Sequence, residues 1–217
     1  MQKRYILSKI YNSLYHYFGP LHWWPGVTPF EVMVGAILTQ NTSWSNVEKV
    51  INNLRKDDLL KPKKLYYMEQ KELAHLLKSC GYFNVKAQRL KNFLNLFITD
   101  FDGSCEKMFE GDDGELREKL LKVNGIGPET ADSILLYAGK KAFFVVDAYT
   151  KRIFSRHKLI SKDSTYSQIQ EFFINNIDRD VELFNEFHAQ IVLLGKTICT
   201  SKNPDCNKCP IAFLNSE

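Results

Sequence analysis

The sequence has no apolar run of about 20 residues, the length that a membrane-spanning helix requires, so we expect no membrane span. Cysteine is scarce, at 5 of 217 residues, which argues against a disulfide-stabilised secreted scaffold. The basic start Met1–Arg4 is interrupted by polar residues further on, so we expect no secretory leader and a reducing, cytoplasmic environment. Internal repeats and low-complexity segments are also lacking, and 44% hydrophobic with 25% charged residues is a globular balance.

A strong excess of one charge is lacking too. The chain has 29 basic and 25 acidic residues, a net charge of +4 and a pI near 8.7. Such a balance permits a polyanionic partner without requiring one. Composition therefore bounds the chain to one or two small domains and leaves its function open.

Helical periodicity dominates what is present. Leu7, Ile10, Leu14 and Phe18 form one apolar stripe, which Gly19-Pro20 ends. Similar stripes follow at 47–54, 90–97, 131–138 and 187–198. Only Ala142–Val146 is a candidate strand, and it is equally compatible with a buried loop or a helix entry. We predict an all-α protein of about ten short helices.

The segment Leu120–Ala131 predicts two helices joined by a short hairpin. Gly125 and Gly127 flank Ile126, which is placed to fill the crevice between the helices. Exposed N–H groups at the start of the second helix favour an anion. An ordinary connector with a glycine C-cap is the alternative interpretation.

Several further motifs occur in a fixed order along the chain. They are Leu121-x-x-x-Gly125-Ile126-Gly127-x-x-Thr130-Ala131, Val145–Asp147, Phe30–Val32, Leu38–Thr42, Gly81–Ala87 and Cys199-x6-Cys206-x2-Cys209. Together they resemble the endonuclease III family of helix-hairpin-helix DNA glycosylases. The resemblance extends over residues 28 to 209 and rests on the order and spacing of these motifs.

The resemblance implies a two-lobed, all-α fold. A six-helix barrel with the hairpin would occupy residues 28–134, and residues 1–27 with 135–217 would join the terminal helices. The expected partner is double-stranded DNA with a damaged base, bound by a monomer in the cytoplasm, on the nucleoid if the source is bacterial or archaeal. The target nucleotide would be rotated out of the stack. The implied DNA-binding residues are Gln40, Asn41, Gly125, Ile126, Gly127 and Thr130.

Two of these implied roles have a plainer alternative. Gln40 is the candidate wedge for the hole left by the flipped nucleotide, or it makes a hydrogen bond at a helix end. Asp147 follows the apolar run 142–146 and precedes a helix, so an N-cap is the structural interpretation. The resemblance assigns Asp147 as the catalytic carboxylate, which stabilises the sugar cation and orients water.

Glu129 stands where bifunctional members of the family carry a nucleophilic lysine. A carboxylate forms no imine, so we expect simple hydrolysis without strand cleavage. Lys140 and Lys141 are the alternative amines near Asp147 in sequence.

Glutamate at this position and tryptophans near the N-terminus resemble the 3-methyladenine glycosylases of the endonuclease III type. Electron-rich indoles attract a cationic alkylated purine. The candidate base-pocket residues are Trp23, Trp24, Trp44, Glu129 and Asp132, with core packing as the alternative for Trp23 and Trp24. His188 is expected to be a buried core histidine, and Gln190 stands where such enzymes carry a functional lysine.

Cys199, Cys206 and Cys209 have the spacing of three of the four ligands of a [4Fe-4S] cluster, as the resemblance implies. The fourth position is Asn215. A cluster with a non-cysteine or missing fourth ligand, a zinc site, and no metal at all remain open.

The leading hypothesis is a monofunctional glycosylase for alkylated purines such as 3-methyladenine. The alternatives are a glycosylase for oxidised pyrimidines or mismatched bases, and a non-catalytic DNA-binding module.

Overall fold

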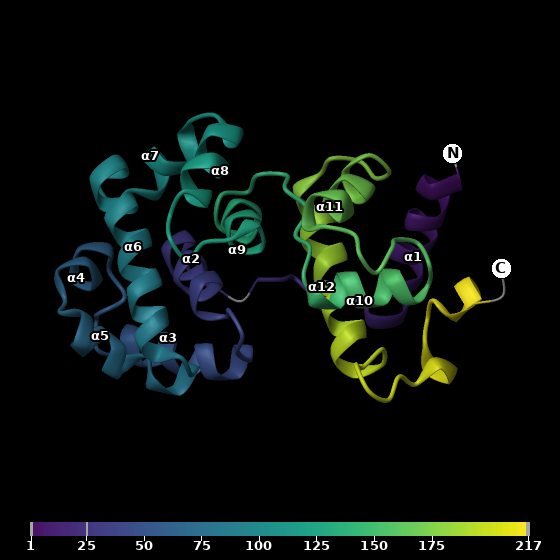
Figure 1. The fold of residues 1–217 in the computed structure, drawn as a ribbon, viewed down its shortest axis with the longest axis horizontal. Coiled ribbons are helices and arrows are strands. Elements are labelled where there is room, and N and C mark those ends of the chain that lie inside the picture. The colour runs from purple at the N-terminus through teal and green to yellow at the C-terminus, as the bar shows by residue number, and fades with distance from the viewer. Residues whose placement is uncertain (1, 25, 216–217) are drawn as a thin grey trace. The chain divides into compact units, whose positions relative to one another are not determined.

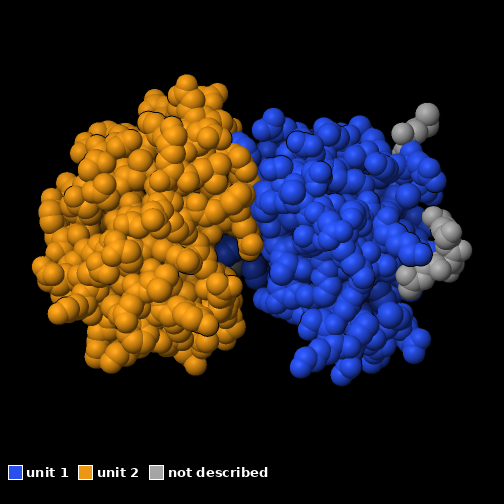
Figure 2. All heavy atoms as spheres, in the orientation of Figure 1, with its two compact units in different colours: residues 1–24, 142–217 blue, residues 25–141 orange. Residues whose placement is uncertain are grey.

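The computed structural model describes residues 2–24 and 26–215, which form twelve α-helices and no strand. The all-α prediction is confirmed. Within those residues no helix has the length and apolar character needed to span a membrane. The chain divides into two compact units, coloured separately in Figure 2. We call residues 25–141 the central unit and residues 1–24 with 142–217 the terminal unit, so the divisions lie at 24/25 and 141/142 instead of 27/28 and 134/135.

The α-helices of the central unit are α2 (Pro29–Leu38), α3 (Trp44–Lys56), α4 (Pro62–Tyr67), α5 (Gln70–Leu76), α6 (Phe83–Phe101), α7 (Cys105–Glu110), α8 (Asp113–Leu121) and α9 (Pro128–Ser133). The core of the unit is formed by the short buried helix α2 and one face of the longer helix α6. Helix α2 is buried from Phe30 to Leu38 because α3, α6 and α9 surround it. The Thr28 hydroxyl starts α2 by accepting a hydrogen bond from the Glu31 N–H at 3.2 Å.

Helix α6 forms the other half of this core, and Figure 1 shows α4 and α5 beside it. Its buried stripe contains Leu90, Phe93 and Phe97, with the rings of Phe93 and Phe97 stacked at 5.6 Å. The helix starts after Gly81 and Tyr82, both of which have positive φ angles. The carboxyl end of α9 continues into one π-helical segment, Ile134–Ala138, which packs on α2.

The terminal unit contains α1 (Gln2–Phe18), α10 (Ala148–Arg156), α11 (Tyr166–Ile174) and α12 (Val181–Thr197). Helix α12 packs against both α1 and α10. The core is aromatic, and Phe144 stacks on Phe173 at 3.9 Å and meets Phe184 edge to face. Residues 142–147 are irregular, so of the three interpretations open from sequence the structure has the buried loop.

Candidate active site

The predicted hairpin is present between α8 and α9. Its turn runs from Lys122 to Gly127, with the Ile126 N–H donating to the Val123 carbonyl at 3.0 Å. Gly125 has a φ of +97°, a left-handed angle that favours glycine. Ile126 is 5% exposed, as expected of a residue that plugs the crevice. Gly127 caps α9 with extended backbone and is followed by Pro128 at the first helical position.

Gln40 contacts the hairpin directly. Its Nε2 donates to the Gly125 carbonyl and to the Thr130 hydroxyl, both at 2.9 Å, and its Oε1 accepts from Arg89. A Cβ at Gly125 would lie 2.2 Å from Cγ of Arg89, so this close approach also requires glycine. Gln40, in the turn after α2, thus bonds the hairpin, and Arg89 of α6 in turn bonds Gln40. Sequence patterns had not singled out Arg89. The wedge role of Gln40 stays a prediction.

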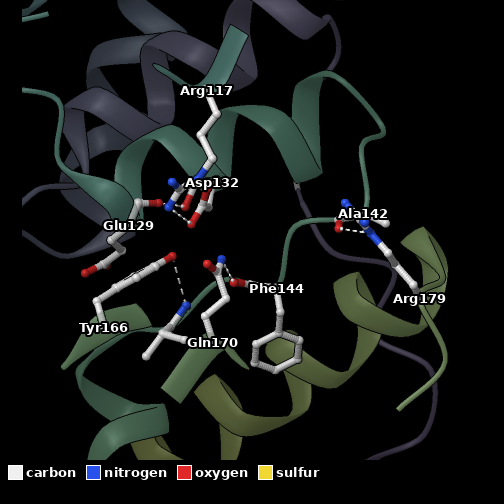
Figure 3. Close-up of polar contacts among 10 residues, drawn as sticks. Arg117, Glu129, Asp132, Ala142, Phe144, Tyr166, Gln170 and Arg179 are labelled. Atoms are coloured by element: carbon white, nitrogen blue, oxygen red, sulfur yellow. Dashed lines mark hydrogen bonds and ion pairs between the residues drawn. The ribbon is translucent and has the colours of Figure 1, made fainter. Parts of the chain in front are cut away.

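The two acidic candidates of α9 differ in their surroundings. Asp132 is fully buried and accepts from Arg117 of α8, with Nε at 2.6 Å and Nη2 at 3.1 Å (Figure 3). This ion pair joins the two helices of the hairpin and compensates the charge of Asp132. Glu129 lies in the first turn of α9 and is exposed. Their assignment to a base pocket stays a prediction.

The loop between α2 and α3 carries two further candidates. Asn41 is exposed and has a φ of +55°, while Trp44 is half-buried at the first position of α3. Tyr82 belongs to the same region, since the Cys80 thiol near it donates to the Asn46 carbonyl at 3.7 Å. Tyr82 is 73% exposed, and sequence analysis gave it no role. The exposure of this ring and its positive φ come from the fold, so the Gly81-Tyr82 pair carried no sequence signal of them.

Asp147 caps α10, so the capping interpretation is confirmed. Its Oδ1 accepts from the Thr150 N–H at 2.7 Å and from the Thr150 hydroxyl at 2.8 Å. The side chain is 12% exposed. A carboxylate so placed has one oxygen occupied by the cap, which leaves Oδ2 for chemistry. Its catalytic role stays a prediction.

Helix α11 holds the segment that leads to Asp147. Gln170 donates to the Phe144 carbonyl at 2.8 Å, and the Tyr166 hydroxyl accepts from the Val146 N–H at 3.4 Å (Figure 3). At the start of this segment, Arg179, which follows α11 in the chain, donates to the Ala142 carbonyl at 3.2 Å. These contacts satisfy the polar backbone of a buried irregular segment and fix the position of Asp147.

His188 of α12 lies beside the carboxylate, with Nε2 at 3.6 Å from Oδ2 of Asp147. Burial raises the pKa of Asp147, but the hydrogen-bonding and charge interaction with His188, together with Thr150, lowers that pKa below its ordinary value. The expectation of a buried histidine is confirmed, at 5% exposure. No sequence pattern indicated that Asp147 would be its partner.

The two N-terminal tryptophans follow a turn that α12 holds in place. Gln190 is fully buried and donates to the Gly19 carbonyl at 2.7 Å, and Glu186 accepts from the Leu21 N–H at 2.8 Å. Trp23 and Trp24 are half-buried and meet edge to face at 5.8 Å. The Lys196 ammonium lies 5.7 Å from the Trp23 ring centre.

Cys199, Cys206 and Cys209 line one cavity of about 180 Å³. Arg156, from the same lining, donates to the Cys199 sulfur at 3.3 Å. Over the described ranges, no group of three or more His, Cys, Asp or Glu side chains lies close enough to hold a metal ion. The side chain of Asn215 lies outside the part of the chain that the structure describes. The three thiols thus share one cavity, and a cluster held by them stays a prediction.

Comparison with known proteins places this geometry in a family. Residues 34–178 match the HhH-GPD superfamily of base excision DNA repair proteins. A Methanocaldococcus jannaschii protein named "Putative DNA repair glycosylase MJ1434" is 48% identical over 208 residues, covering 95% of this chain and 94% of that protein. Endonuclease III of Thermotoga maritima is 27% identical over 83% of this chain and 79% of that protein.

Solved structures agree with the sequence matches. A non-covalent endonuclease III–DNA complex superposes with a TM-score of 0.81 at 21% identity, covering 98% of this chain and 93% of that one. The Helicobacter pylori 3-methyladenine DNA glycosylase MagIII, bound to 1,N6-ethenoadenine, has a TM-score of 0.74 at 32% identity, covering 89% and 97%. The chain therefore belongs to the HhH-GPD superfamily of base excision DNA repair proteins, as a DNA glycosylase of the endonuclease III family.

Proposed function

We propose that this protein is a monofunctional DNA glycosylase that hydrolyses the N-glycosidic bond of an alkylated purine, such as 3-methyladenine, in double-stranded DNA. The observation that carries the proposal is Glu129, a carboxylate in the α9 position where a nucleophilic lysine would stand. The 32% identity to a 3-methyladenine glycosylase over 89% of the chain supports the choice of lesion.

In the central unit, the hairpin serves to hold the DNA backbone. Extended backbone at Gly127 and the start of α9 present N–H groups to a phosphate. No side chain is needed for this contact, which suits a site that must accept any sequence. Asn41, next to Gln40, is exposed, as is Tyr82 before the start of α6, and an aromatic ring can stack on an unpaired base.

In the terminal unit, Asp147 serves as the catalytic carboxylate. As the bond between C1′ and the base nitrogen breaks, its electron pair goes to the departing purine and cancels the positive charge of the alkylated ring. The ionised carboxylate stabilises the cationic sugar, and water adds to C1′. The proton released by that water passes to Oδ2 of Asp147 or to solvent.

We do not assign Lys140 or Lys141, the two lysines near Asp147 in sequence, as a replacement for the missing nucleophile. Lys141 is paired with Asp113 at 2.8 Å, with 24% of its side chain exposed. This ion pair would have to break before the Lys141 amine could act as a nucleophile. Lys140 lies next to it at a φ of +54°, in the turn after the π-helical segment.

Tryptophan is suited to recognise a cationic base. Trp23 already attracts the Lys196 ammonium, which lies over its ring. The same attraction acts on a ring that carries a positive charge from alkylation. We assign Trp23 and Trp24 of the terminal unit to base recognition, and Trp44, Glu129 and Asp132 of the central unit stay predicted base-recognition residues.

The test is a panel of oligonucleotides that contain 3-methyladenine, 1,N6-ethenoadenine, thymine glycol or a G·T mismatch. We expect release of the free alkylated base and no strand break until alkali is added. Borohydride should trap no protein–DNA adduct. A trapped adduct, or faster release of thymine glycol than of 3-methyladenine, would overturn the proposal.

A gain of function sharpens the test of Glu129. Glu129→Lys supplies the missing amine, so a borohydride-trapped adduct should appear with an abasic site. Glu129→Gln is the matched control, because it removes the charge without adding a nucleophile, and no adduct should form. Equal trapping by both variants would show that another amine reacts.

A [4Fe-4S] cluster on Cys199, Cys206 and Cys209 stays a prediction. Such a group would supply structural support to the loop after α12. Iron, sulfide and zinc analysis of protein purified without oxygen, together with its visible spectrum, tests it. Cys206→Ser should abolish iron binding if the cluster forms, whereas Cys105→Ser, in α7, should leave it unchanged.

A further inference from the structure

The two oxygens of the Asp147 carboxylate have different neighbours. Oδ1 is held by two hydrogen bonds from Thr150, at 2.7 and 2.8 Å. Oδ2 faces Nε2 of His188 at 3.6 Å. The cap thus consumes one oxygen, while the other has a titratable neighbour from a different helix.

A close helix contact brings this histidine to the carboxylate. Helices α10 and α12 pack together, and a Cβ on Gly195 would lie 2.4 Å from Cδ1 of Tyr149. Gly195 is seven residues after His188 and so lies on the same face of α12. Glycine at 195 therefore permits the approach that places the imidazole of His188 beside the N-terminus of α10.

The 3.6 Å separation of Nε2 and Oδ2 is longer than a hydrogen bond, and a small approach of the ring lets the imidazole donate one N–H to Oδ2. That donation favours the ionised carboxylate and limits its rotation, both of which a group that stabilises a cationic sugar requires. The lowered pKa of Asp147 has this cause in part, since His188 and Thr150 together outweigh the effect of burial. Besides these two side chains, the neighbouring α11 contributes the Tyr166 hydroxyl, which is bound to the Val146 N–H.

We propose that His188 is a positioning residue, which holds Oδ2 of Asp147 ionised and oriented for the glycosylase reaction. This inference rests on the proposed role of Asp147. It assigns to α12 a part in catalysis that is separate from the binding of DNA.

The first experiment compares His188→Phe with His188→Gln. His188→Phe removes the donor and keeps a large ring, so kcat should fall about 10- to 100-fold while KM for the lesion oligonucleotide stays within about twofold. His188→Gln keeps an N–H donor and should recover part of kcat. Equal kcat values in wild type and His188→Phe would overturn the proposal.

The pH dependence of kcat separates positioning from a structural role. With His188 replaced by Phe, one cause that lowers the pKa of Asp147 is gone, so the acid limb of the profile should move to higher pH. Phe187→Leu is the matched control on the same helix, because its ring packs on Phe144 and Phe173 instead of on Asp147. That variant should lower the melting temperature without moving the acid limb.

A second readout needs no turnover. The imidazole nitrogen signals of His188 in the NMR spectrum should change in Asp147→Asn, because the carboxylate that faces Nε2 is replaced. Unchanged signals would contradict the contact. The outcomes are separable: an active Asp147→Asn overturns the proposed function, whereas an inactive Asp147→Asn with a fully active His188→Phe overturns only this inference.

Discussion

The hairpin of the central unit and the carboxylate turn of the terminal unit present different chemical groups to a ligand. The hairpin is shaped by Gly125, Gly127 and the polar contacts of Gln40, and it offers backbone N–H groups to a ligand. The carboxylate turn, residues 142–150, is buried at Phe144–Val146 and at Thr150, is anchored by α11 and α12, and offers the Asp147 carboxylate. Damage to the first should therefore weaken binding, and damage to the second should stop the reaction.

The largest expected effect is on the carboxylate turn. Asp147→Asn keeps an oxygen that can cap α10 but removes the negative charge, so turnover should fall at least about a thousandfold. Single-turnover release of 3-methyladenine measures the loss. Affinity for the same duplex, measured by fluorescence anisotropy, should change by less than about threefold because the hairpin is intact.

The outcome that breaks the comparison is equally clear. If Asp147→Asn loses affinity and turnover together, the carboxylate turn contributes to binding as well as to reaction. If turnover survives, a carboxylate is not needed, and the chain is a DNA-binding module or uses another group.

The second effect is on the hairpin. Gly125→Ala forces a Cβ to within 2.2 Å of Arg89 Cγ at a φ of +97°, so we expect a loss of about 1–3 kcal/mol in stability. DNA affinity should fall by about tenfold or more, since the turn moves relative to the phosphate. Urea unfolding and anisotropy measure the two losses.

Gly127→Ala is the matched control, because a Cβ there meets nothing within 4 Å and its φ of −94° is ordinary. That variant should be folded and bind DNA with at most a small loss. Equal damage by both alanines would show that the glycines serve ligand access rather than backbone shape.

The same contrast explains what the sequence predicted. The hairpin was predictable because it is local: two glycines, one apolar plug and a proline at the start of α9 define it within a few residues. The cap at Asp147 was predictable for the same reason. Stripes of apolar residues identified α1, α3, α6 and α12 because burial of one face imposes a helical period.

The long-range contacts were not predictable. Gln40 with Gly125, Arg117 with Asp132 and Asp147 with His188 each join different helices or loops. Periodicity shows which face of a helix is buried but not which side chain it meets. For the same reason the sequence could not indicate that Asp132 is fully buried in an ion pair with Arg117.

The third prediction concerns the exposed aromatic ring of Tyr82 in the central unit. Tyr82→Ala should weaken DNA binding by about 1–3 kcal/mol if the ring stacks on a base. Tyr67→Ala in α4 is matched in exposure, at 75% against 73%, and should have no effect. Loss of affinity in both variants would indicate a general effect of surface aromatics and not a base contact at Tyr82.

The smallest expected effect tests whether Gln40 only supports the hairpin or also acts as a wedge in the DNA. Its amide makes two hydrogen bonds to the hairpin at 2.9 Å, so Gln40→Ala should lower stability by about 1–2 kcal/mol and affinity a few-fold. A wedge has a further consequence, because without it the flipped nucleotide returns to the stack and turnover of bound DNA falls. Fluorescence of 2-aminopurine beside the lesion reports that flipping. Reduced affinity with unchanged flipping would assign Gln40 to the hairpin alone, whereas reduced flipping at saturating protein would show that it must leave the Gly125 carbonyl to act.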